Sequence, residues 1–227
     1  MEVTDIIQPG QGERKGIENW LKGATQEEII TAIINSGRDP LTGLLNRRGG
    51  LEEIERVKLI LEANKHELAK AGSLGEEHAG LRLLGVASIQ IYAMDLSGFK
   101  GYNDKFGQEE GDKMLKKFAG GMLQTFHRST DICMRWGGDE FLVIVFNSKV
   151  TDENVLAAEK AKLDVFLGGG VSTYVVLGNL AGDKDILKGI NGAFKELAEV
   201  KKVGPVDSTG RSTSGGFKMI DLGEING

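Results

Sequence analysis

The chain is poor in the residues and runs that mark several classes of protein. It has one cysteine, Cys133, among 227 residues, so no disulfide can form within the chain. No stretch approaches the roughly 18 apolar residues that span a bilayer, and the N-terminus lacks the basic-then-apolar layout of a secretion signal. We therefore expect a cytoplasmic protein with no membrane partner, in which Cys133 is a buried, reduced thiol.

Other absences exclude particular chemistries. The three histidines are scattered and, with a single cysteine, form no pattern typical of zinc. The sequence has neither a Gly-x-x-x-x-Gly-Lys phosphate loop nor a Gly-x-Ser-x-Gly nucleophile turn. A formal net charge of −5 disfavours long nucleic acid as a partner, whereas a local basic pocket is still able to hold a small phosphate ligand.

The hydrophobic pattern predicts helices that alternate with strands. Thr25 and Glu28 form a capping box before a stripe of isoleucines, which indicates a short helical extension over residues 1–38, suited to dimerisation or to capping the main domain. The helix-breaking segment Gly37–Pro40 places the start of the main domain, 39–227, at residue 39. The expected helices cover 48–71, 108–127, 153–166 and 185–200, and the expected apolar segments and strands cover 86–94, 132–136, 141–146 and 171–177.

This order of elements indicates an α/β (α+β) fold with one mixed sheet. We expect a palm-like or ferredoxin-like, mostly antiparallel sheet flanked by helices. Residues 72–80 read as a loop, and the Gly-, Ser- and Thr-rich tail after Val206 receives no assignment. In the segment at 86–94, isoleucines alternate with Ser88, Gln90 and Tyr92, which is typical of a strand.

Acidic residues stand at the ends of two predicted strands. Asp95 ends one strand, and Asp139 and Glu140 follow the pair Gly137-Gly138, which predicts a tight hairpin with acids at its tip. We expect Asp95 and Asp139 on neighbouring strands. Mg²⁺ prefers oxygen ligands and commonly takes one or two carboxylates together with phosphate oxygens. The pattern therefore predicts a metal site against a nucleotide triphosphate, near a lysine at position 100 that neutralises phosphate charge.

Three segments together carry a resemblance to a known family. They are Asp39–Arg48 (DPLTGLLNRR), the block from Asp95 to Asp112, and Arg135–Phe141 (RWGGDEF). Through them the chain resembles the GGDEF family, the diguanylate cyclases, over roughly residues 39–205.

The resemblance implies a role for each matching residue. The implied ligands of Mg²⁺ (or Mn²⁺) are Asp95, the Leu96 carbonyl, Asp139 and Glu140. Of these, Asp139 or Glu140 also helps to activate the attacking 3′-hydroxyl, with Lys100 as the third implied catalytic residue. Asn103 and Asp112 match the positions that read the guanine edge. A carboxylate accepts hydrogen bonds from the N1–H and exocyclic amine of guanine, and adenine has no such donor pair, so Asp112 favours GTP. The implied substrate contacts are Gly98, Phe99, Lys100, Asn103, Asp112, Gly137, Gly138 and Lys201.

The implied reaction joins two GTP molecules into cyclic di-GMP and releases pyrophosphate. Each domain binds one GTP, so the resemblance implies a homodimer. Arg128 and Asp131 have the spacing of the family's product-inhibition site. Three positions depart from the family pattern: Ser97 replaces a second aspartate, Gln108 a histidine, and Pro205 an arginine after the Lys-x-x-Gly element of Lys201 and Gly204.

Other functions stay open at this point. A degenerate domain that binds cyclic di-GMP as a receptor retains Arg128 and Asp131, and Ser97 and Pro205 favour it mildly. A related cyclase that makes another dinucleotide, and a scaffold whose N-terminal helices recruit a partner, are further alternatives. Each residue also has an ordinary interpretation, since Asn103 suits a turn, Asp112 a first-turn helix acid, and Lys100 and Lys201 a solvated surface.

Overall fold

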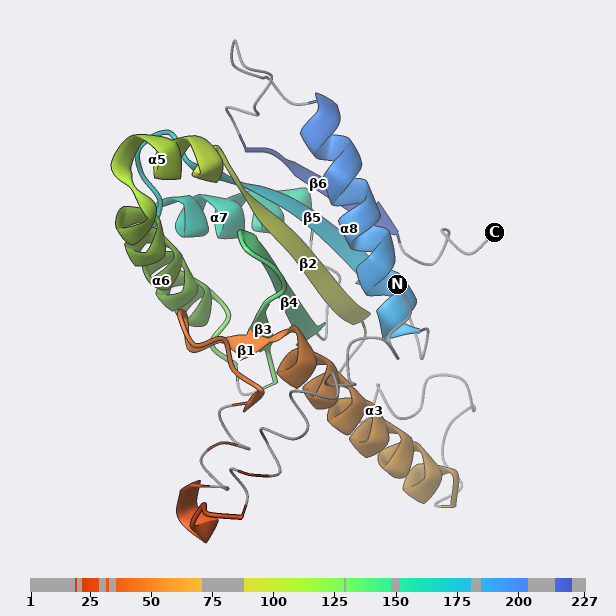
Figure 1. Cartoon of the computed structure of the whole chain (residues 1–227). Helices are drawn as coiled ribbons and strands as arrows, with labels where there is room; N and C mark the ends of the chain where they lie inside the picture. The colour runs from red at the N-terminus through yellow and green to blue at the C-terminus, as the bar shows by residue number, and fades with distance from the viewer. Residues whose placement is uncertain are drawn as a thin grey trace.

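A six-stranded sheet organises the molecule (Figure 1), in the order β1-β3-β4-β2-β5-β6. The computed structural model describes residues 19, 22–28, 32, 36–70, 88–128, 130–147, 152–180, 185–203 and 215–221. The strands are β1 (Leu45–Asn46), β2 (Ser88–Ser97), β3 (Ile132–Arg135), β4 (Glu140–Asn147), β5 (Ser172–Leu180) and β6 (Phe217–Asp221). The helices are α3 (Arg47–Lys70), α5 (Phe99–Phe106), α6 (Gln108–Thr125), α7 (Glu153–Asp164) and α8 (Ile186–Val203).

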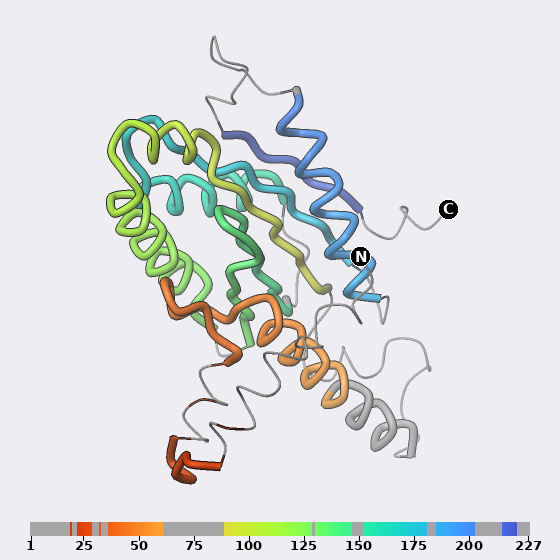
Figure 2. Tube along the Cα trace, viewed as in Figure 1, coloured from red at the N-terminus to blue at the C-terminus, as the bar shows by residue number. Residues whose placement is uncertain are grey.

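The central strands are antiparallel and the edge pairs are parallel. β2 pairs antiparallel with β4 on one side and with β5 on the other, and β3 pairs antiparallel with β4. The short β1 runs parallel to β3, and β6 runs parallel to β5. The path of the chain through these strands can be followed in Figure 2. The prediction of a mixed, mostly antiparallel sheet flanked by helices is confirmed.

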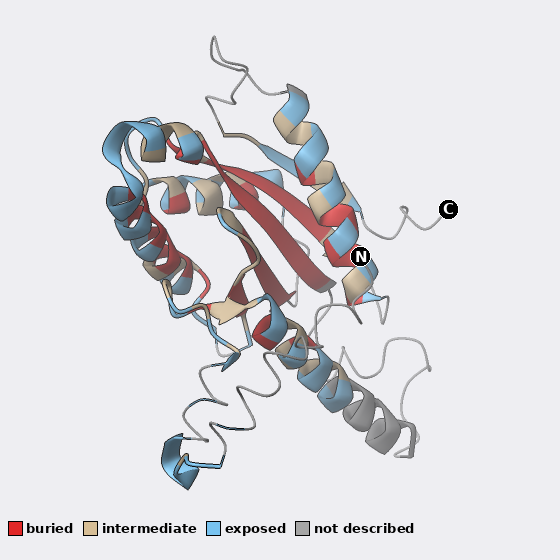
Figure 3. Cartoon of the chain, viewed as in Figure 1, coloured by how far each residue is buried: buried red, intermediate tan, exposed pale blue. Residues whose placement is uncertain are grey.

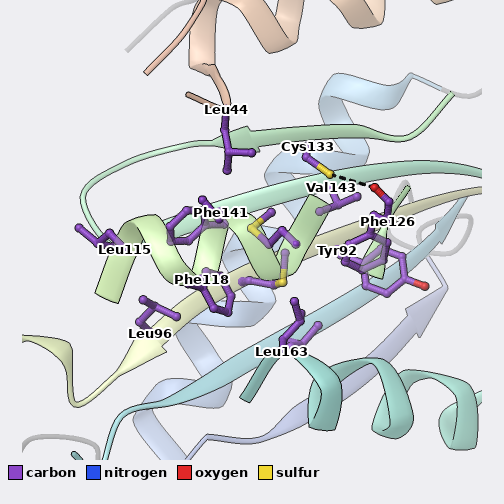
Figure 4. Packing of buried hydrophobic residues seen from close by; sticks show 14 of the residues in the cluster. Leu44, Tyr92, Leu96, Leu115, Phe118, Phe126, Cys133, Phe141, Val143 and Leu163 are labelled. Atoms are coloured by element: carbon purple, nitrogen blue, oxygen red, sulfur yellow. Dashed lines mark hydrogen bonds between the residues drawn. The ribbon is translucent and has the colours of Figure 1, made fainter. Parts of the chain in front are cut away.

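Helices cover both faces of the sheet, so β2 is buried on both sides (Figure 3). Side chains such as Tyr92 and Met94 pack with α6 and α7, and part of this cluster is seen in Figure 4. The alternate residues of the same strand, such as Ile91, pack with α3 and α8. The predicted strand is present, and the residues that alternate with its isoleucines are buried as well, since Gln90 is fully buried and Tyr92 is 2 % exposed. Alternation indicates a half-solvated strand, whereas a central strand between two helical layers has no solvated face.

The predicted elements are found with shifted ends and three additions. Gly107, at φ 90°, separates α5 from α6, whereas one helix beginning at 108 was expected. The two-residue β1 and the tail strand β6 were not predicted. Cys133 is a buried free thiol, as predicted. Within the described part of the chain, no helix is both long and apolar enough to cross a membrane.

The N-terminal extension is described in part. The capping box is present: the Thr25 amide donates to Glu28 Oε2 at 2.8 Å, and the Glu28 amide donates to Thr25 Oγ1 at 3.2 Å. The isoleucine stripe at 29–34, the loop at 72–80 and the pair Gly204-Pro205 lie outside the described residues. The division at residue 39 stays a prediction.

Candidate functional site

The acidic residues meet where β2 ends and β4 begins. Asp95 and Glu140 are directly paired in the antiparallel register of these strands. The Leu96 amide donates to the Asp139 carbonyl oxygen at 3.1 Å, which continues the pairing one residue beyond the ladder. The prediction of neighbouring strands is therefore confirmed, and the sheet itself positions the three acids.

The Gly-Gly turn, residues 137–140, is closed by backbone hydrogen bonds. The amides of Trp136 and Gly137 donate to the Glu140 carbonyl oxygen at 2.8 and 3.2 Å. A β-carbon placed on Gly137 lies 2.7 Å from Glu140 Oε2, whereas one placed on Gly138 has no heavy atom within 4 Å. The Glu140 carboxylate thus folds back over Gly137, and the absence of a side chain there leaves it room.

Arg135 ties this turn to the segment at the start of the main domain. Its Nε and Nη2 donate to the Gly138 carbonyl oxygen at 3.0 and 2.6 Å, and its Nη1 donates to the Asp39 carboxylate at 3.1 and 3.2 Å. Burial raises the pKa of Asp39, but hydrogen bonds from Thr42 and Arg135 outweigh it, so the net pKa lies below the ordinary value. The Arg135 and Asp39 side chains are 14 % and 16 % exposed, so water screens this ion pair little.

Trp136 secures the turn from the other side. The Arg47 guanidinium lies 4.3 Å from the centroid of its ring, and the Phe194 ring from α8 stacks on it at 5.3 Å with an interplanar angle of 20°. Such contacts are each worth roughly 0.5–1.5 kcal/mol. Trp136 is thus a packing residue that joins α3, the turn and α8.

Asp95 is a buried carboxylate that lies near one lysine and two other acids. It is 2 % exposed, and the Lys201 amine of α8 donates to its Oδ2 at 2.7 Å. Burial is the largest cause that raises the pKa of Asp95 to about 6; Lys201 lowers it, and the negative charges of Asp139 and Glu140 raise it further. Lys201 thus offsets the charges of the two neighbouring acids, and burial accounts for the net rise in the pKa of Asp95.

The oxygen donors of this set are of the type that a hard divalent cation takes, although the three carboxylates are not gathered around one point in this structure. Oxygen ligands at the ends of β2 and β4 with excess negative charge are what Mg²⁺ or Mn²⁺ prefers. Among the described residues, no three His, Cys, Asp or Glu side chains gather into a metal-binding group. Ser97, in place of a second aspartate, is 3 % exposed and adds no charge.

The segment that follows β2 forms a turn and two helices. Gly98 adopts φ 80°, and a β-carbon there lies 3.2 Å from the Gly170 carbonyl oxygen, so this position requires glycine. Phe99 is buried, whereas Lys100 is exposed at the start of α5. The Asn103 side chain packs on Gly111, where a β-carbon overlaps its Oδ1. Asp112, the next residue after Gly111 in α6, is exposed.

Arg128 and Asp131 form a reciprocal turn just before β3. The Arg128 amide donates to Asp131 Oδ2 at 3.1 Å, and the Asp131 amide donates to the Arg128 carbonyl oxygen at 3.0 Å. Burial raises the pKa of Asp131, and its Oδ1 is buried with no hydrogen-bond partner in the structure. The Arg128 side chain is exposed. β3 links this turn to Arg135, so the two candidate sites lie at its two ends.

Glu159 of α7 is a partly buried acid near the turn of Arg128 and Asp131 that the sequence did not reveal. Burial raises its pKa; Tyr92 and Lys162 lower it, while the charges of Asp131 and Arg128 act in opposite directions. Its Oε2 is also buried without a hydrogen-bond partner. One signal was available, because Glu159 lies three and four residues from the buried Leu156 and Leu163, on the apolar stripe of the helix.

A family model described as "Diguanylate cyclase, GGDEF domain" matches residues 82–165, which contain β2, β4 and the turn between Arg135 and Glu140. Over these residues the chain is similar to the GGDEF domain of diguanylate cyclases. The match excludes Asp39 and Lys201, which the fold nevertheless places in contact with Arg135 and Asp95.

Curated relatives match this chain over part of their length. Diguanylate cyclase DgcS of Shewanella oneidensis is 48 % identical over 58 residues, which cover 26 % of this chain and 19 % of that protein. Diguanylate cyclase DgcP of Escherichia coli is 32 % identical over 127 residues, which cover 56 % of this chain and 31 % of that protein. The chain thus spans about a fifth to a third of the length of these relatives.

Solved structures support the fold of the GGDEF domain. The diguanylate cyclase SiaD of Pseudomonas aeruginosa, solved with its activator SiaC, has a TM-score of 0.53 at 23 % identity, covering 91 % of this chain and 71 % of that one. The GGDEF domain of DgcB from Caulobacter crescentus, solved with c-di-GMP, has a TM-score of 0.54 at 18 % identity, covering 80 % and 95 %. At these identities the likeness concerns the fold alone.

Proposed function

We propose that this chain is a diguanylate cyclase that condenses two GTP molecules into cyclic di-GMP. The observation that carries the proposal is the pairing of Asp95 with Glu140, which brings the carboxylate residues Asp95, Asp139 and Glu140 to one end of the central strands. The similarity to the GGDEF domain and the relatives named diguanylate cyclase support the same activity.

The acids at the ends of β2 and β4 have two roles in this reaction, metal binding and proton transfer. Asp95, the Leu96 carbonyl, Asp139 and Glu140 would hold Mg²⁺ or Mn²⁺, which supplies charge stabilisation at the phosphates and lowers the pKa of the attacking hydroxyl. Asp139 or Glu140 takes the proton from the 3′-hydroxyl. The 3′-oxygen then bonds to the α-phosphorus of the second GTP, and the bond to the pyrophosphate oxygen breaks. Two such steps close the ring and release two pyrophosphates.

Other residues orient the substrate. The Asp112 carboxylate accepts from guanine N1–H and the exocyclic amine, and Asn103, whose side chain packs on Gly111, contacts the same base. Lys100, exposed at the start of α5, and Lys201 neutralise the phosphates, with backbone contacts from Gly98, Phe99, Gly137 and Gly138. Because one domain binds one GTP, the active species is a homodimer with two facing sites.

The turn of Arg128 and Asp131 is the product-inhibition site in this proposal. An exposed guanidinium suits a phosphate or a guanine edge, and Asp131 offers a carboxylate to the guanine donors. The alternative is a receptor that binds cyclic di-GMP here and has lost catalysis. Ser97 favours it, because its buried hydroxyl replaces a charged metal ligand.

Two variants measured in two assays separate these functions. The variants are Asp139→Asn and Arg128→Ala, and the assays are product formation from GTP and calorimetric binding of cyclic di-GMP. A cyclase loses product formation with Asp139→Asn, and keeps product formation but loses inhibition with Arg128→Ala. A receptor makes no product as the unaltered protein, binds cyclic di-GMP equally well with Asp139→Asn, and loses binding with Arg128→Ala.

A further inference from the structure

The ion pair between Lys201 and Asp95 joins two residues to which the proposed function gives different partners. Lys201 Nζ lies 2.7 Å from Asp95 Oδ2, and the Asp95 side chain is only 3 % exposed. In the proposed reaction Asp95 holds a metal ion and Lys201 contacts phosphate. The structure instead pairs them with each other.

A metal ion and the lysine amine compete for this carboxylate. Both are cations, and both are drawn to the charge that Asp95 shares with Asp139 and Glu140. A carboxyl group this buried has little surface to offer to two cations at once. The amine already occupies Oδ2 at hydrogen-bonding distance, so a metal ion that binds Asp95 has to displace it or share the carboxylate with a like charge.

The lysine is free to leave without repacking the core. Buried Ile190, Ala193 and Leu197 anchor α8 on the sheet. Lys201 lies in the last turn of that helix, and its side chain is 38 % exposed. Its flexible four-carbon stem can therefore turn towards solvent, or towards a phosphate, while the helix stays in place.

We propose that Lys201 is an internal counter-ion that occupies Asp95 until a nucleotide triphosphate draws its amine away. In the free protein the lysine weakens metal binding. The phosphates of an arriving nucleotide attract the amine and bring the metal ion, so metal and nucleotide load together. This inference rests on the proposed function, because it takes the metal at Asp95 and the phosphate contact of Lys201 from it.

The test measures metal affinity without nucleotide, using Mn²⁺ and the electron paramagnetic resonance signal of the free ion. Lys201→Met removes the competing charge and should tighten Mn²⁺ binding by about tenfold or more. Lys202→Met is the matched control, because it removes the same charge one residue later. Lys202 is 67 % exposed and pairs with Glu199, so its loss should change the affinity by less than about twofold.

A second measurement titrates GTP into each protein in the presence of EDTA. Lys201→Met should weaken this metal-free binding, so one substitution moves the two affinities in opposite directions. Unchanged or weaker Mn²⁺ binding by Lys201→Met overturns the proposal, as does metal-free GTP binding equal to that of the unaltered protein. If either of these results is found while the unaltered protein still makes product from GTP, only the counter-ion role of Lys201 fails. If neither protein binds Mn²⁺ and no product forms, the proposed function has failed with it.

Discussion

Replacing Arg135 should separate the stability of this domain from the geometry of its acidic turn. Arg135→Ala removes the ion pair with Asp39 and two hydrogen bonds to the Gly138 carbonyl oxygen. Removing one partner of a pair this sheltered leaves the Asp39 charge with only the hydrogen bonds from Thr42, so we expect a loss of about 3 kcal/mol in the free energy of unfolding. In urea, that loss shifts the midpoint by roughly 1–2 M.

Arg135→Lys is the informative companion variant. A lysine amine keeps a positive charge for Asp39, but it cannot reach Asp39 and the Gly138 carbonyl with a planar fork. We expect about 1 kcal/mol of destabilisation but a fall in cyclic di-GMP formation approaching that of Arg135→Ala. The physical reason is that Asp139 directly follows the freed carbonyl, and displacement of a catalytic group by about 1 Å costs on the order of a hundredfold in rate.

The assays are urea unfolding followed by circular dichroism, and product formation at a temperature where each variant stays folded. An Asp39→Asn variant, alone and combined with Arg135→Ala, gives the coupling energy of the pair. Additive losses would show that the two side chains do not interact. A fully active Arg135→Lys protein would refute the idea that the arginine fork positions the turn.

Three further variants and one reagent test other parts of the structure. Gly137→Ala pushes a methyl group against the flexible end of Glu140, so we expect weaker Mn²⁺ binding with less than about 1 kcal/mol of destabilisation, whereas Gly138→Ala should leave Glu140 undisturbed. Burial raises the pKa of Cys133 to about 12, so iodoacetamide at pH 8 should add mass to the urea-unfolded protein much faster than to the folded one. Equal rates would show that the thiol is accessible. The pKa of Glu159 is raised in the folded protein, so its contribution to stability is present below its unfolded pKa and is lost as pH rises through the folded value. Glu159→Gln should therefore resist urea better relative to the unaltered protein at pH 7.5 than at pH 4, and the opposite order would contradict the assignment.

Local sequence patterns predicted the elements well where the cause is local. The capping box of Thr25 and Glu28 and the apolar stripe of the helix after Arg48 depend on residues within a few positions of each other. The burial of both sides of β2 could not be predicted in this way. Gln90 is buried because two helical layers from distant parts of the chain cover the strand, and alternation within the strand carries no record of them.

In the candidate site too, local patterns indicated some residues, whereas contacts between distant parts of the chain could not be predicted. The sequence indicated the acids because Asp95 ends a strand and Asp139 follows a Gly-Gly turn, and the register of β2 and β4 brings them together. It did not indicate which residues hold the turn, since Asp39 and Arg135 are 96 positions apart. The pairing of Lys201 with Asp95 spans 106 positions and is equally invisible to a local pattern.

The most direct test of the central claim identifies the product by mass spectrometry. Purified protein at high concentration is incubated with Mg²⁺ and with GTP, ATP or both. We expect cyclic di-GMP from GTP alone, and none when Asp139 is replaced by Asn. A product that contains adenine would contradict the guanine contacts assigned to Asn103 and Asp112, and no product under any condition would contradict the proposal that this chain is a cyclase.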